Sequence, residues 1–186
     1  MKLFKKLLFG LLALTILTFL LRNWLFWQLF SYQSVGDRPT YAIENPELRT
    51  YIESELPANS VKSPRVILKK ALQLSAKQLH FSAARNHNDP NLLIDSHSAH
   101  CVGYAAFTTT ICNELLQHYQ LNAEWKAEAR VGQIHFLGIN VHPYFQSAFF
   151  KDHDFVVLRN LKTGEELAAD PTVYDYLGFG MVRVRR

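Results

Sequence analysis

The chain has 186 residues, which allow one ordinary domain plus an appendage and exclude a large multidomain enzyme. Its formal net charge of +4 belongs to the N-terminus, because residues 1–22 hold no acidic group and the rest of the chain balances its 16 acidic groups with as many basic ones. This balance excludes a broad nucleic-acid-binding face, and only Arg183, Arg185 and Arg186 form a local basic patch.

Residues 1–30 predict an uncleaved membrane anchor. Lys2, Lys5 and Lys6 precede an apolar run, and the span from Leu7 to Phe26 has the roughly 20 residues that a helix needs to cross a bilayer. No small residues suited to signal cleavage follow the run, which places a cleaved signal second and a buried soluble helix third. The positive-inside rule keeps the lysines cytoplasmic and predicts a single-pass membrane protein whose C-terminal domain is periplasmic or extracellular.

Residues 31–62 are polar and punctuated by prolines, which predicts a linker that carries one short helix. Asn45 is the expected N-cap of this helix, Pro46 its first residue and Pro57 its end. The domain proper is expected at residues 63–186. It opens with a helix from Pro64 that continues to about Leu79, followed by a loop at Arg85–Pro90. The expected buried stripe of this helix is Val66, Ile67, Ala71, Leu74 and Leu79.

A helix is predicted from Cys101 to about Tyr119, which places Cys101 at its N-terminus. Unpaired backbone N–H groups and the positive end of the helix dipole stabilise a thiolate there. Cys112 lies about 16 Å farther along the axis, too far for a disulfide, and is expected in the core. The expected core face is Ala105, Thr108, Cys112, Leu115 and Leu116.

Strands are predicted at Ala123–Ile134, Phe136–Val141 and Lys151–Leu158, and a turn at Lys162–Gly164 leads into a returning strand. This hairpin places His153 and Asp170 at the same edge of a sheet. A cysteine at a helix start, a histidine and a carboxylate are the groups that thiol acyl transfer requires.

With Cys101-Val102-Gly103-Tyr104-Ala105, His153-Asp154-Phe155 and Asp170-Pro171-Thr172, the chain resembles the transglutaminase-like superfamily of papain-like cysteine enzymes in its short microbial form. The resemblance implies an α+β fold in which the nucleophile helix packs on an antiparallel sheet. It makes Cys101 the nucleophile, His153 the general base and acid, and Asp170 the orienting carboxylate. No cofactor or metal is implied. A second oxyanion donor has three candidates, His87, Asn88 and Asn91, and the segment from Val131 to Phe150 is expected to wall the substrate groove.

The expected activity is attack on an amide or glutamine carbonyl of a peptide or protein substrate through a thioester. Water makes such an enzyme a peptidase or amidase, which is slightly preferred, and an amine makes it a transglutaminase. The alternative is a non-catalytic module that keeps the fold and binds a peptide or protein at the membrane. A disulfide-handling protein is disfavoured because the chain has no Cys-x-x-Cys pair.

The chain has eight histidines, which raises the alternative of a metal site. His97 and His100 are three residues apart, with His87 and Asp95 nearby, but this spacing is weakly specific and the serines around it predict a loop. His118 and His142 are expected to be surface or partly buried structural residues. His135 is expected on the polar face of a strand.

Overall fold

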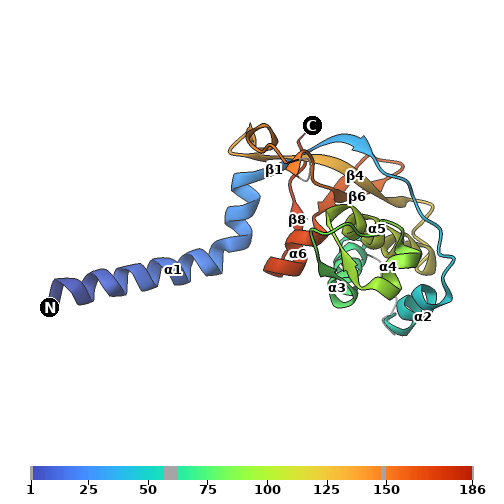
Figure 1. The fold of residues 1–186 in the computed structure, drawn as a ribbon, viewed down its shortest axis with the longest axis horizontal. Helices are drawn as coiled ribbons and strands as arrows, with labels where there is room; N and C mark the ends of the chain where they lie inside the picture. The colour runs from blue at the N-terminus through green and yellow to red at the C-terminus, as the bar shows by residue number, and fades with distance from the viewer. Residues whose placement is uncertain (1, 57–62, 148–149, 186) are drawn as a thin grey trace.

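The structure is a computed structural model that describes residues 2–56, 63–147 and 150–185. Helix α1, Lys2–Leu29, projects away from the rest of the chain (Figure 1). Its segment Phe4–Leu29 is long and apolar enough to cross a membrane, with a mean hydropathy of 2.0. The expected span is therefore confirmed in length and composition. A signal sequence has the same length and composition, so it stays a prediction that the helix is uncleaved and that the lysines are cytoplasmic.

The main sheet is antiparallel and has the strand order β1-β4-β6-β7-β8, with β5 paired to β4. The residues just after β8 pair with β1. The Tyr32 N–H donates to the Arg183 carbonyl, and the Arg185 N–H donates to the Tyr32 carbonyl, both at 2.8 Å. The sheet therefore curls until its two edges meet. Its strands are β1 Phe30–Asp37, β4 Trp125–Phe136, β5 Ile139–Asn140, β6 Phe155–Asn160, β7 Glu166–Ala169 and β8 Met181–Val182.

Proline at the first helical position starts four of the described helices, where its missing N–H has no intrahelical partner to lose. Asn45, Asp89 and Asp170 precede three of them as N-caps whose side chains accept backbone N–H groups of the first turn. These helices are α2 Pro46–Ser54, α3 Pro64–Gln78, α4 Pro90–Ser96 and α6 Pro171–Leu177. Two further short strands, β2 His80–Phe81 and β3 Ser98–Ala99, pair in parallel. A 3₁₀ helix covers His142–Tyr144.

Helix α5, Cys101–His118, lies at the centre of the core and packs against α3 on one side and against β4 and β6 on the other. Figure 1 shows α3, α4 and α5 together on one side of the sheet. The predicted core face of this helix is confirmed, since all five of its residues are buried. The chain is thus α+β with a helix packed on an antiparallel sheet, as expected.

Two expectations for residues 31–79 are corrected. Ser31–Asp37 is not linker but belongs to strand β1, because pairing with β4 and with the C-terminal segment satisfies its backbone although its side chains are mostly polar. Val66 is 50% exposed rather than buried. Helix α2 begins as predicted, and its expected end at Pro57 lies outside the described residues, as does the rest of the expected linker to Lys62.

Two short helices and a burial pattern were not expected from the sequence. Helix α4 follows the predicted loop, and α6 begins directly after Asp170. His135 is buried rather than exposed on a polar strand face. A seven-residue helix makes too few turns to show an apolar period.

Gly132 in β4 allows a close approach between β4 and the segment that enters β6. A Cβ at this position would lie 2.6 Å from the Phe155 ring and 2.8 Å from the His153 carbonyl oxygen. The Gly132 carbonyl also accepts the His153 N–H at 2.8 Å. Because Gly132 has no side chain, the backbone of His153 can lie directly against β4.

We expect Gly132→Ala to lower the free energy of unfolding by about 1–3 kcal/mol, because the added methyl group overpacks this contact. Gly36→Ala is the matched control, since its Cβ would meet Val131 at an ordinary 3.6 Å. Urea denaturation followed by circular dichroism measures both variants. Equal stability of the two variants would contradict the close-approach explanation.

Candidate active site

Cys101 is the first residue of α5 and is buried, with 7% of the residue exposed. His100 caps the helix, because its Nδ1 accepts the Val102 N–H at 3.3 Å. At the first helical position the Cys101 N–H has no intrahelical acceptor. Cys101 thus lies at the positive end of an 18-residue helix.

His153 lies two residues before β6, and its ring connects Cys101 with Asp170. Its Nε2–H donates to Asp170 Oδ2 at 2.7 Å, and His153 and Cys101 line the same cavity. Because Nε2 is engaged with the carboxylate, Nδ1 is the ring nitrogen left for the sulfur. The three side chains that the sequence singled out are therefore brought together in the expected order.

Asp170 is completely buried and accepts hydrogen bonds at both carboxylate oxygens. Oδ2 accepts from the Tyr32 hydroxyl at 2.7 Å in addition to His153. Oδ1 accepts the backbone N–H groups of Thr172 at 2.9 Å and Val173 at 3.0 Å, which also caps α6. Burial raises the pKa of Asp170, but the charge of His153 and the hydrogen bonds outweigh burial, so the pKa lies below its usual value.

Opposing influences also act on His153, whose side chain is 19% exposed. Burial by itself lowers the pKa of the imidazole, whereas the Asp170 charge, its hydrogen bond and the contact with Cys101 raise it. The net pKa lies well above the usual value, so the imidazolium is the favoured form at neutral pH. Complete burial raises the pKa of the Cys112 thiol to about 12.

Tyr32 and Arg38 belong to the surroundings of the site although the sequence placed both in a linker. Tyr32 in β1 is fully buried and bonds Asp170 as described. Arg38, just after β1, donates to the buried Asp154 carboxylate from Nε at 2.7 Å and Nη2 at 3.0 Å. This bidentate pair fixes the residue that follows His153, and no local pattern in the sequence reveals either partner.

A cavity of about 280 Å³ opens beside Cys101 and His153. The predicted wall Val131–Phe150 does contribute to it, through Ile134, Val141, His142, Phe145 and Phe150. His142 is buried and ties this wall to β4, because Nε2 accepts the Ile134 N–H at 2.8 Å and Nδ1 donates to the Phe150 carbonyl at 2.7 Å.

The three candidate oxyanion donors differ in their surroundings. The Asn91 side chain is engaged elsewhere: its Oδ1 accepts the N–H groups of Glu44 at 2.8 Å and Asn45 at 2.9 Å, and its amide donates to Ala42. Asn91 is therefore a structural tie rather than an oxyanion donor. His87 and Asn88 are exposed. The His87 carbonyl lies 3.1 Å from a Cβ built at Gly103, which places its backbone against the first turn of α5.

The histidines considered for a metal site have other partners. His97 Nδ1 lies 2.8 Å from the Gln78 side-chain nitrogen, and His100 caps α5. Within residues 2–56, 63–147 and 150–185, no group of three or more His, Cys, Asp or Glu residues is arranged to hold a metal ion.

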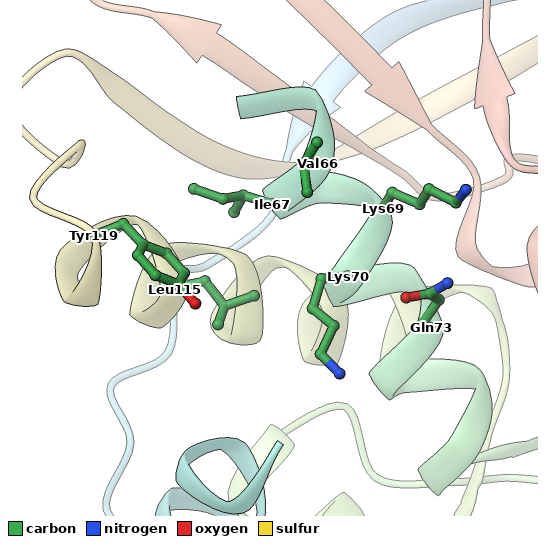
Figure 2. Close-up of a pocket in the computed structure, with 7 residues that line it drawn as sticks. All are labelled: Val66, Ile67, Lys69, Lys70, Gln73, Leu115 and Tyr119. Atoms are coloured by element: carbon green, nitrogen blue, oxygen red, sulfur yellow. The ribbon is translucent and has the colours of Figure 1, made fainter. Parts of the chain in front are cut away.

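A second cavity, of about 290 Å³, lies between α3 and the C-terminal end of α5 (Figure 2). Leu115 on its wall is about 20 Å from Cys101 at 1.5 Å per helical residue. Its lining contains lysine, glutamine, tyrosine and aliphatic side chains but no cysteine, histidine or carboxylate. It therefore offers no counterpart to the arrangement around Cys101.

No family model, no curated protein and no solved structure matches the chain. The resemblance to transglutaminase-like enzymes therefore stays a prediction from the sequence.

We expect Tyr32→Phe to lower the free energy of unfolding by about 1.5–3 kcal/mol, because it removes a hydrogen bond to a buried charged group. Tyr104→Phe is the matched control: its hydroxyl donates to Asp175 at 2.8 Å, but Asp175 is only partly buried. Urea denaturation at pH 7 compares the two. A loss in Tyr32→Phe no larger than that in Tyr104→Phe would contradict a special role for the Asp170 hydrogen bond.

Proposed function

We propose that the protein is a membrane-anchored thiol enzyme with a transglutaminase-like core, which acts on amide carbonyls of peptides or proteins. One observation carries the proposal: His153 is hydrogen-bonded to the Asp170 carboxylate and lines the same cavity as Cys101, which is the first residue of a long helix. A histidine between a thiol and a buried carboxylate is the arrangement that activates a cysteine nucleophile.

In the first step, the Cys101 thiolate attacks the carbonyl carbon, and the Cys101 N–H donates to the oxyanion that develops. The carbon–nitrogen bond then breaks, the His153 imidazolium gives its proton to the leaving amine, and a thioester remains on Cys101. Asp170 stays ionised, holds the ring by Nε2 and stabilises its positive charge.

The fate of the thioester decides between a peptidase or amidase and a protein-glutamine acyl transferase. His153 is partly exposed, which supports hydrolysis because water can reach the group that must activate it. Hydrolysis is therefore the preferred second step, with His153 acting as the general base for water.

The proposed location is a membrane, with the domain on the extracytoplasmic side. This orientation follows from the N-terminal lysines and the apolar helix. Strand β1 begins directly after α1, and the Leu137 N–H donates to the Leu29 carbonyl at 2.8 Å, so the sheet starts where the helix ends. The enzyme would thus work close to the bilayer surface.

The proposal predicts that Cys101 reacts quickly with iodoacetamide and that the fast reaction depends on His153, because the imidazole takes the proton of the thiol. The measurement is the alkylation rate of the full chain in detergent micelles between about pH 5 and 9, read by mass spectrometry. His153→Ala should remove the fast reaction below about pH 8.

Cys101→Ala identifies the reacting sulfur in this experiment, and Cys112 should stay unlabelled because it is buried and its thiol pKa is raised to about 12. His118→Ala is the control for loss of an exposed histidine. If Cys101 reacts like an ordinary thiol and its rate ignores His153, the enzyme proposal fails and a non-catalytic binding module is the better description.

A further inference from the structure

The cavity beside Cys101 has walls that are almost entirely apolar. Apart from Cys101 and His153, its lining consists of five apolar residues together with His142, Asp152 and Thr172. Both His142 nitrogens are already hydrogen-bonded, so that ring offers a ligand no free polar atom. The Asp152 side chain is 42% exposed, which places a carboxylate in solvent next to an apolar interior. The apolar walls are Phe81, Ile134, Val141, Phe145 and Phe150.

Phe145 and Phe150 pack against each other at the wall of the cavity. Their rings pack with centroids 5.1 Å apart, and His142 ties the segment to β4 on both sides of its ring. The two residues nevertheless stay 45% and 47% exposed. Exposed aromatic surface that lines a concave site is typical of a binding site for small apolar groups.

The geometry points to a substrate class, and we propose that this cavity binds an apolar side chain on the residue whose carbonyl Cys101 attacks. The inference rests on the proposed function and adds the identity of the acyl-donating residue. A volume of about 280 Å³ lies just below the usual range for ligand sites, roughly 300–1,000 Å³, which suits one side chain better than a long lipid chain.

Activated esters test the inference because their first step is simple to observe. The Cys101 thiolate attacks the ester carbonyl of an N-acetyl-amino-acid p-nitrophenyl ester, the carbon–oxygen bond breaks, and p-nitrophenolate leaves as the thioester forms. The phenolate leaves without a proton, so the His153 imidazolium first loses its proton to solvent, and the neutral ring then takes a proton from the water that attacks the thioester. The absorbance burst of p-nitrophenolate therefore reports acylation of Cys101.

The full chain in detergent micelles is mixed with esters of glycine, alanine, norvaline and norleucine. We expect the acylation rate to rise about fourfold for each methylene that enters the cavity, as apolar burial of this size implies, until the side chain fills it. The esters have equal leaving groups, so differences in rate report the side chain.

Val141→Phe should fill the cavity and abolish the gain in rate from the glycine ester to the norleucine ester. Ile139→Phe is the matched control: it adds the same ring two residues away on β5, where Ile139 is 58% exposed and outside the lining. This control should keep the full preference for norleucine.

Three results would overturn the inference. Equal burst rates for the glycine and norleucine esters leave Cys101 a nucleophile but remove the side-chain site. Faster acylation by p-nitrophenyl hexanoate than by the norleucine ester makes the occupant a fatty acyl chain instead. No burst beyond that of Cys101→Ala with any ester contradicts the proposed function itself, and the inference falls with it.

Discussion

The rest of the site depends on how the completely buried carboxylate of Asp170 is hydrogen-bonded. A charge without water costs several kcal/mol unless hydrogen bonds and an opposite charge replace its hydration. Here the replacements come from three places in the chain: Tyr32 in β1, His153 before β6, and the first backbone N–H groups of α6. Because only the assembled sheet brings these donors together, the folded core and the orientation of the His153 ring are consequences of the same contacts.

Strand β1 has two functions in this arrangement. Its backbone pairs with β4 and with the segment after β8, which closes the sheet, and its residues and those just after it supply Tyr32 and Arg38. The Arg38–Asp154 pair holds the residue that follows His153, and the bare backbone of Gly132 lets that segment approach β4. The strand that supports the histidine thus follows directly from the apolar N-terminal helix, so the site and the expected membrane surface lie at neighbouring parts of one short domain.

Local signals in the sequence sufficed for the helix that begins at Cys101, for the helix starts at Pro46 and Pro64, and for the hairpin that joins His153 to Asp170. They failed for β1, because its pairing partners are about 100 and 150 residues away and its side chains do not alternate cleanly between apolar and polar. Tyr32 and Arg38 were missed for that reason. The sequence could not decide whether His97 and His100 bind a metal or whether Asn91 is an oxyanion donor. That decision depends on the hydrogen-bond partners of these side chains, which only the three-dimensional structure shows.

The central claim is that His153 is held as an imidazolium between Asp170 and Cys101, and nitrogen NMR of the ¹⁵N-histidine-labelled full chain tests it most directly. His153→Gln assigns the resonance, and a pH titration in detergent micelles follows both ring nitrogens. We predict that His153 stays doubly protonated well above pH 6.5, and that Cys101→Ala lowers its pKa without returning it to the ordinary value, because Asp170 remains. Loss of the proton near or below pH 6.5, with no response to Cys101→Ala, would contradict the ion pair and the catalytic role built on it.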